Sequence, residues 1–317
     1  EQPLIEKAEI IKRQKLIEAL NANEITRDEI REYLNPIYDL ERLITRITYQ
    51  SANPRDLIAF RDSLKMLPPI KQQLSDIPCA LTDEINEEFD ELKDIYELLL
   101  SSIEDEPPIS QRDGDIIKAG YNEEVDRLRD AKTKGKTWLA ELEAGEREKT
   151  GIKNLRIKYN KVFGYYLEVT NSFKDLVPDY YVRKQTLTNA ERYITPELKE
   201  LEDTILGAED RLTSLEYELF RDVRKQISDN VSRIQKTARA IAQIDVFASL
   251  ALVASQNNYC KPKINESGII DIKNGRHPVV EKMITNDMFI ENDTYLDQHK
   301  NRISIITGPN MAGKSTY

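Results

Sequence analysis

A helical run without proline constrains the fold of this chain more than any other feature. It extends from Glu197 to the residue before Pro262, and its apolar or small residues step by alternating threes and fours, the spacing of a coiled-coil seam: Leu198, Leu201, Ile205, Ala208, Leu212, Leu215 and Leu219. Steps of four at Val223, Ile227 and Val231 then form a stutter, which locally unwinds a supercoil. Up to about 60 helical residues would reach about 90 Å, so the run predicts a long arm.

A second helical stretch precedes this run, and a segment with strand spacing separates the two. Helical spacing over residues 121–148 corresponds to a helix of about 42 Å. From Ile152 to Pro196 the apolar period falls from about 3.6 to 2 residues, which marks strands. Alternation at 155–160, a turn near Gly164 and strand spacing at 165–169 predict a hairpin, and 180–187 adds a further β-rich piece. The simplest arrangement is an antiparallel helix pair that holds a small sheet at its tip.

The two ends of the chain differ in character. Residues 4–60 have helical spacing, Asn53 and Pro54 predict the start of a helix, and Pro68 and Pro69 predict its end. Towards the C-terminus, 268–272 predicts a short strand and Arg302–Thr307 a buried one. The expected fold class is therefore mainly α, with long antiparallel helical arms, a small inserted antiparallel sheet and the opening strands of an α/β domain.

Charge and residue usage exclude several classes of protein. Lys and Arg number 46 against 56 Asp and Glu, so the net charge of −10 argues against a uniformly basic nucleic-acid coat protein. Cys79 and Cys260 are far apart, which excludes a disulfide framework and a cysteine-based zinc site. His277 and His299 have no neighbours at the spacing of a catalytic triad or a zinc hydrolase. No run of about 18 apolar residues occurs, so we expect a cytoplasmic protein without a membrane partner.

Positive charge is concentrated in the strand segment. Residues 152–196 contain eight Lys or Arg against four Asp or Glu, a local charge of +4 in an acidic chain. A nucleic-acid phosphate backbone is the predicted partner. The candidate DNA-binding residues are Arg156, Lys158, Asn160, Lys161, Arg183, Lys184 and Arg192. The alternative is that these side chains are merely solvated. The six tyrosines of the segment are expected to form the core of the sheet rather than to stack on bases.

A phosphate-binding loop is predicted close to the end of the sequence. The pattern is carried by Gly308, Pro309, Asn310, Met311, Ala312, Gly313, Lys314 and Ser315. Backbone N–H groups and a helix N-terminus would converge there on one anion site, with Lys314 on the phosphates and Ser315 holding Mg²⁺. The alternative is an ordinary glycine turn. Hydrolysis would also need a carboxylate from a further strand, so this chain alone is predicted to be inactive as an ATPase.

Four segments together resemble the MutS family of bacterial DNA mismatch-repair proteins. They are Gly275-Arg276-His277-Pro278-Val279-Val280-Glu281, Thr307 to Tyr317, Asn189 to Leu198, and Phe163-Gly164-Tyr165-Tyr166. The resemblance implies a helical core with lever arms, a clamp that grips DNA, and the start of an ABC-type ATPase that works as a dimer. It divides the chain into a first core and lever part (1–142), an inserted β clamp (143–196), a return lever (197–257) and the start of the ATPase domain (258–317).

The same resemblance implies roles for individual residues and for partners. It places Phe289 and Met311 against the adenine of ATP and adds Thr316 to the nucleotide-binding residues; Phe289 could instead be a core aromatic. Ala312 stands where many members carry glycine. The implied partners are a second subunit and a MutL-type repair factor. The family's mismatch-reading domain, with its Phe-x-Glu wedge, is not represented, so we expect a piece of a longer protein, nucleoid-associated in use.

The predicted function is to grip duplex DNA in mismatch repair and to couple ATP binding and hydrolysis to formation of a sliding clamp. A first alternative is the MutS-like class that acts in recombination control, although its members lack a clamp. A second is an ABC ATPase of the structural-maintenance type, which would carry a hinge in place of the charged strand segment. A third is a coiled-coil interaction module, which the phosphate loop disfavours.

Overall fold

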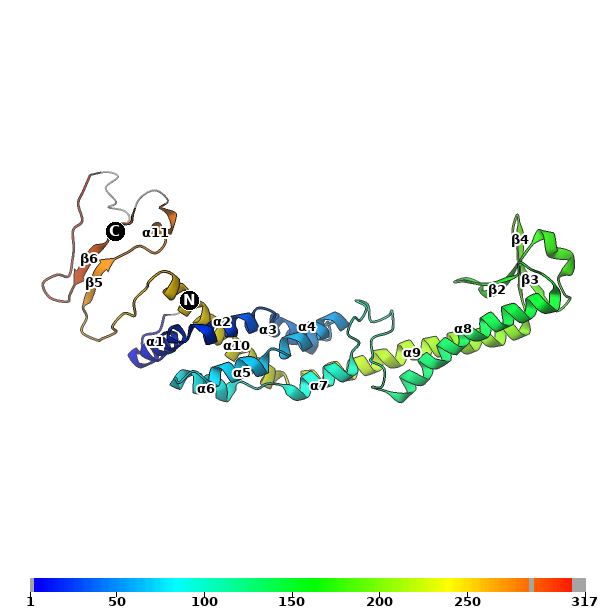
Figure 1. Cartoon of the computed structure of the whole chain (residues 1–317), viewed down its shortest axis with the longest axis horizontal. Coiled ribbons are helices and arrows are strands. Elements are labelled where there is room, and N and C mark those ends of the chain that lie inside the picture. The colour runs from blue at the N-terminus through cyan, green and yellow to red at the C-terminus, as the bar shows by residue number, and fades with distance from the viewer. Residues whose placement is uncertain (1–2, 285–287, 310–317) are drawn as a thin grey trace.

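An elongated molecule carries a small sheet at one end and a helical core towards the other, as the computed structural model in Figure 1 shows. The structure describes residues 3–284 and 288–309. The core is built from α1 (Lys7–Ala22), α2 (Glu24–Leu34), α3 (Leu40–Thr48), α4 (Pro54–Leu64), α5 (Leu67–Ser75), α6 (Ala80–Glu88), α7 (Lys93–Ser102) and α10 (Val231–Gln256). Their buried side chains form one apolar cluster, which the end of α9 (Pro196–Ser228) enters through Phe220, Val223 and Ile227.

The helix α10 runs through this core and packs against α1, α2, α3 and α6. Ala240, Ile244, Ala248 and Ala251 on its inner face are buried. Among the described residues it is the one helix long and apolar enough to cross a membrane by length and composition alone. Its apolar character is explained by its position, because it contacts other helices over much of its length.

Local capping explains where α4 and α5 begin. Asn53 accepts a hydrogen bond from the N–H of Asp56, Asp56 accepts one from the N–H of Asn53, and Pro54 occupies the first turn. This confirms the predicted helix start. The prediction that Pro68 and Pro69 end the helix was wrong, because α4 stops at Leu64 and both prolines lie in the first turn of α5. Proline is tolerated there because the first N–H groups of a helix have no partner within it.

The arms are α8 (Glu123–Thr150) and α9, which lie side by side (Figure 1). Val125, Leu128 and Leu212 are buried between them near the core. Gly135 permits a close approach, because a Cβ at that position would lie 2.6 Å from Cγ1 of Ile205. The antiparallel pair that holds a sheet at its tip is therefore confirmed.

The proline-free run folds as two helices rather than one continuous helix, which the prediction leaves open. It is divided at Asp229 and Asn230 into α9 and α10. The break falls within the predicted stutter, at the point where the chain leaves its pairing with α8 and enters the core. A helix cannot keep one seam facing α8 and also direct a different face into the core without changing register.

Four antiparallel strands form the sheet at the tip, named here the clamp sheet: β1 (Arg156–Asn160), β2 (Gly164–Thr170), β3 (Val182–Thr186) and β4 (Ala190–Ile194), in the order β1-β2-β4-β3. A 3₁₀ turn, η1 (Asn171–Leu176), follows β2. The predicted hairpin is confirmed as β1 and β2, whereas the sequence pattern did not single out β4. The inner face of the sheet packs on the arms through Leu167, Val169 and Tyr193, against Leu142, Leu198 and Ile205.

The described C-terminal part contains a two-stranded antiparallel sheet, β5 (Ile270–Gly275) with β6 (Asn292–Leu296), and the short helix α11 (Val280–Met283). It lies at the end of the molecule opposite the clamp sheet (Figure 1). The short strand expected near residue 270 is therefore present. The buried strand predicted at Arg302–Thr307 was wrong: the segment has no strand pairing, and Ile303 and Ile305 are 84% and 85% exposed. An apolar segment becomes a buried strand only when neighbouring strands cover it, and none of the described strands pairs with this one.

Candidate nucleic-acid interface

Strand alternation sorts the predicted DNA-binding residues by face. Ile157 packs on the apolar cluster of the inner face. Arg156, Lys158 and Asn160 therefore lie together on the outer face of β1, because alternate residues of a strand share a face. The register continues this face across the sheet, since Arg156 lies opposite Glu168, Glu168 opposite Arg192, and Arg192 opposite Gln185. Arg156, Lys158 and Arg192 thus belong to one surface.

The cations of the outer face are held by acidic neighbours. Lys158 Nζ lies 2.7 Å from Glu168 Oε1, and Arg192 Nε lies 3.7 Å from Glu168 Oε2. The Arg192 guanidinium also stacks 4.4 Å from the centroid of the Tyr166 ring, and its Nη1 donates to Gln185 Oε1 at 2.8 Å. Arg156 Nη1 lies 3.2 Å from Glu143 Oε1, which comes from α8. These contacts fix the directions of side chains that would otherwise be flexible.

The remaining candidates lie at the margins of the sheet. Arg183 Nη1 is 3.7 Å from Glu191 Oε1, and Lys184 sits at a bulge between β3 and β4. Lys161 lies in the turn between β1 and β2. Within the described part of the chain, Lys161 and Lys184 have no ion pair. The Oδ1 of Asn160 already accepts the N–H of Val162 at 2.8 Å, so this residue has a structural use in the turn.

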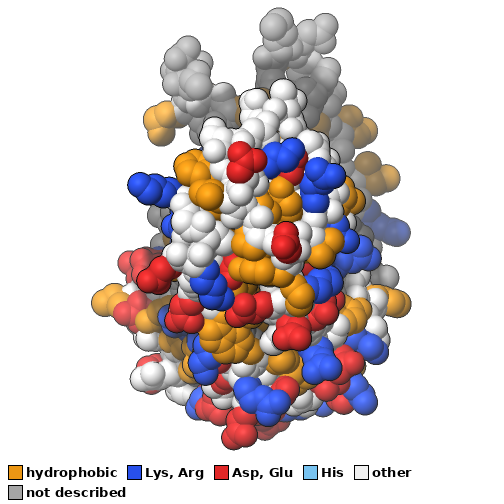
Figure 2. Space-filling model, turned by 90° about the vertical axis from the view of Figure 1, so that its right-hand side faces the viewer, with side chains coloured by type: hydrophobic (Ala, Val, Ile, Leu, Met, Phe, Trp, Pro, Cys, Tyr) orange, Lys and Arg blue, Asp and Glu red, His pale blue; other side chains and the backbone are white. Residues whose placement is uncertain are grey.

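Acidic residues from the arms reduce the positive charge that the count over residues 152–196 predicts. Glu143 and Glu146 of α8 and Glu202 of α9 all reach the clamp sheet. Figure 2, which looks onto the clamp end, shows red and blue side chains interspersed with orange ones rather than one blue face. Counting charges along the sequence misses this, because the neutralising carboxylates belong to helices outside the counted segment.

A buried carboxylate anchors the clamp sheet to the arms. Glu146 is 2% exposed, and its Oε2 accepts hydrogen bonds from the hydroxyls of Tyr181 at 2.8 Å and Tyr180 at 2.9 Å. Lys149 Nζ lies 3.1 Å from its Oε1. Burial acts to raise the pKa of Glu146, but the hydrogen bonds from Tyr181, Tyr180 and Lys149 outweigh it, and the net pKa is lowered. Burial and the bond to Glu146 raise the pKa of Tyr180 to about 12.

The tyrosines of the segment serve mainly as core, as expected. Tyr166, Tyr181 and Tyr193 are each at most 6% exposed, and Tyr181 and Tyr193 pack with ring centroids 5.7 Å apart. Tyr159 and Tyr180 are about half exposed. Base stacking by the buried rings is excluded by their position.

The predicted nucleotide site falls mostly outside the described residues. Gly308 and Pro309 are exposed and belong to no helix or strand, and Phe289, in the chain segment between α11 and β6, is partly buried. Outside the described residues lie Asn310, Met311, Ala312, Gly313, Lys314, Ser315 and Thr316. The roles assigned to this loop, to ATP and to Mg²⁺ therefore stay predictions.

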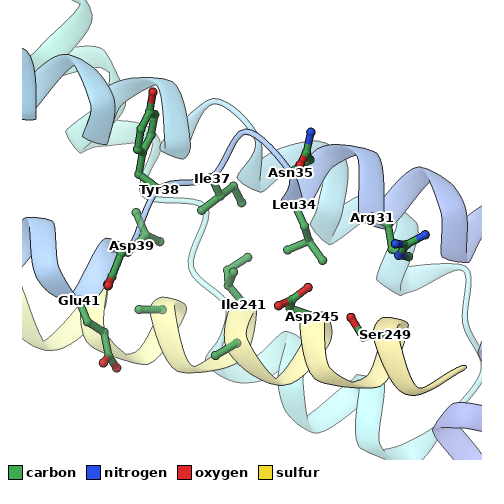
Figure 3. A pocket seen from close by; sticks show the side chains of 13 residues that line it. Arg31, Leu34, Asn35, Ile37, Tyr38, Asp39, Glu41, Ile241, Asp245 and Ser249 are labelled. Atoms are coloured by element: carbon green, nitrogen blue, oxygen red, sulfur yellow. The ribbon is translucent and has the colours of Figure 1, made fainter. Parts of the chain in front are cut away.

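A groove of about 450 Å³ lies on the core, between α10 and the segment that joins α2 to α3. Figure 3 shows Asp245 and Ser249 of α10 on one side and Arg31 and Leu34 of α2 on the other. Its charged residues are exposed. Within the described residues no three His, Cys, Asp or Glu side chains are grouped as a metal site.

Comparison with known proteins places the chain in a family. Residues 1–251 match the description "MutS domain III". The full chain is 66% identical to the DNA mismatch repair protein MutS of Lachnoclostridium phytofermentans and 53% identical to that of Acetivibrio thermocellus, and it covers 34% and 36% of those proteins. It is 56% identical to the MutS of Caldanaerobacter subterraneus, of which it covers 36%. The chain thus spans about a third of the length of these relatives. It belongs to the MutS family.

Proposed function

We propose that this chain grips duplex DNA through the outer face of the clamp sheet, as part of a protein of DNA mismatch repair. The observation that carries the proposal is the joint placement of Arg156, Lys158 and Arg192 on one rigid surface at the end of the arms, remote from the core. The names of the relatives, which are DNA mismatch repair proteins, support the same process.

The contacts proposed are to phosphates. The ion pair to Glu168 occupies one of the three N–H donors of Lys158, whereas in Arg192 the contacts to Glu168 and Gln185 occupy two of five. Phosphates carry no sequence information, so the grip is non-specific. Side chains that are already oriented lose less conformational entropy when they bind than free ones do. Glu168 therefore has two effects, since it orients both cations and competes with the phosphate for them.

We further propose that the loop at 308–316 binds ATP, with Phe289 and Met311 at the adenine, Lys314 at the phosphates and Ser315 at Mg²⁺. The nucleotide would supply the free energy for switching the whole protein between scanning and sliding states. The packed pair α8 and α9 would transmit that state, since a packed helix pair moves more nearly as a rigid body than a chain of loops does. We expect no ATP turnover by the chain alone, because a Mg²⁺-binding carboxylate must come from a further strand.

The partners proposed from the family are a second subunit and a MutL-type repair factor, in the cytoplasm. The described clamp sheet disfavours the MutS-like class that lacks a clamp. It also disfavours the structural-maintenance ATPases, because the arms end in a charged antiparallel sheet rather than a hinge.

Salt-titrated binding to matched and mismatched duplexes tests the proposal. We expect weak binding that falls steeply with salt and is equal for both duplexes. The double variant R156E/K158E should bind more weakly and with a shallower salt slope, whereas K134E/K136E changes charge equally on an exposed part of α8 and should have a smaller effect. Unchanged binding by R156E/K158E would remove both residues from the interface.

A further inference from the structure

The β1–β2 hairpin extends beyond the four-stranded part of the clamp sheet. The strand β4 pairs with β2 only at residues 167–170, whereas β1 and β2 remain paired as far as Asn160 and Gly164. Three rows of paired residues and the turn therefore continue as a two-stranded ribbon, residues 158–166, whose Gly164 and Tyr165 pack on the arms while the turn at 161–163 is exposed. In Figure 1 the part of the sheet that carries β2 reaches back over the arms towards the core.

The tip of this ribbon is pre-organised. The N–H of Phe163 donates to the carbonyl of Asn160 at 3.2 Å, and the N–H of Val162 donates to Asn160 Oδ1 at 2.8 Å. Gly164 follows with a φ of +73°, which completes the three-residue hairpin loop that needs a left-handed residue at this position. Just below the turn, the rings of Tyr159 and Tyr165 pack with centroids 5.0 Å apart. The turn is thus held by backbone, side-chain and ring contacts together.

What the tip presents is apolar surface beside positive charge. Val162 is 81% exposed and Phe163 44% exposed. Lys161 stands next to them and has no ion pair among the described residues, and Lys158 lies in the third row of paired residues below the turn. Phosphate contact alone would need cations here but not two neighbouring apolar side chains on a rigid turn.

We propose that the turn of this ribbon, residues 161–163, enters the major groove of duplex DNA, with Val162 and Phe163 against apolar parts of the base edges and Lys161 on a flanking phosphate. The major groove, about 12 Å wide, admits a two-stranded β-ribbon and is about twice as wide as the minor groove, at about 6 Å. This inference rests on the proposed DNA grip and specifies how it is made. It adds an apolar contribution to affinity that does not depend on salt, because only phosphate contacts release counterions.

Binding by the 317-residue chain and by V162S/F163S, measured over a salt series, tests the inference. Burial of one Val or Phe side chain contributes roughly a tenfold gain in affinity. We therefore expect V162S/F163S to bind duplex DNA roughly tenfold or more weakly with an unchanged salt slope. In contrast, K161Q should lower the slope by about one phosphate contact. V162I/F163L, which keeps the apolar surface, should retain the affinity.

Duplex RNA and a second apolar site supply the controls. The major groove of A-form RNA is too narrow for side chains to read, so V162S/F163S and the unmodified chain should bind duplex RNA equally. Leu176 is 50% exposed in the same sheet region, and L176S should leave DNA binding unchanged. Circular dichroism checks that each variant is folded.

The outcomes separate the inference from the proposed function. If the unmodified chain binds DNA with steep salt dependence and V162S/F163S binds equally well, the groove contact is wrong and the phosphate grip stands. An equal loss on DNA and RNA would also overturn the groove contact. If the unmodified chain shows no salt-dependent binding to DNA, the proposed function fails, and the groove contact fails with it.

Discussion

Gly164 is the position where the hairpin meets the arm, and replacing it with alanine has an effect that the structure allows to be divided in two. The first part is backbone strain, since the φ of +73° costs a non-glycine residue about 1–2 kcal/mol. The second is crowding, because an added Cβ would overlap Oε1 of Glu202 and lie 2.7 Å from its Cδ. Overpacking of this kind costs about 1–3 kcal/mol. We expect Gly164→Ala to lower the free energy of unfolding of the clamp sheet by about 2–5 kcal/mol.

A double-mutant cycle with Glu202 separates the two parts. Glu202 is 5% exposed on α9, and among the residues that the structure describes its carboxylate forms an ion pair with Lys199 alone, at 3.3 Å. In an E202A background the crowding disappears, so Gly164→Ala should cost only the backbone part, about 1–2 kcal/mol. The difference between the two backgrounds is the coupling free energy.

Urea unfolding followed by fluorescence provides the measurement. Trp138 is the single tryptophan of the chain, and it lies on α8, the helix that supports the clamp sheet. Its emission therefore reports on the arms beside the sheet. An equal cost of Gly164→Ala in both backgrounds would refute the crowding argument. A cost near zero in both would refute the strain argument as well.

Two further predictions concern buried charges. The pKa of Glu146 is lower in the folded chain than in the unfolded one, so its contribution to stability is present above the unfolded pKa and is lost as pH falls through the folded pKa. In urea titrations at several pH values, E146Q should lack this loss of stability at acid pH. If the free energy of unfolding of E146Q instead falls in parallel with that of the unmodified chain, the role assigned to Glu146 is wrong. Arg224 is 3% exposed and donates to the carbonyls of Gln50 at 2.7 Å and Ala52 at 3.1 Å. R224A should therefore lower the free energy of unfolding, measured by circular dichroism in urea, by about 2–4 kcal/mol. A loss below about 0.5 kcal/mol would show that these carbonyls find other partners.

Family membership was accessible from the sequence because short motifs report it directly. The segments around Asn189 to Leu198 and Gly275 to Glu281 carry the resemblance, and the match of residues 1–251 to MutS domain III confirms the family. The division into four domains stays a prediction, as do the roles of the nucleotide-loop residues.

The arm and sheet architecture was also predictable, because hydrophobic periodicity is a local property. A period near 3.6 on either side of a period of 2 places strands between two long helices, and the simplest arrangement of one helix that enters a small sheet and one that leaves it is antiparallel. The strand at residues 302–307 was mispredicted for the opposite reason. An apolar run becomes a buried strand only if other strands cover it, and that depends on chain segments distant in the sequence.

Local sequence pattern is enough to predict the secondary structure of the arms, the face of β1 that carries Arg156 and Lys158, and the family. In contrast, the charges that remain available and the position of the break in the long helix depend on tertiary packing. Glu143 lies 13 residues from Arg156 and reaches it because α8 ends beneath the sheet, and the break at Asp229 and Asn230 occurs where α9 leaves one partner for another. The Glu143–Arg156 contact and the helix break both depend on which helix faces pack together. Packing between segments distant in the sequence decides this, and the local sequence pattern does not.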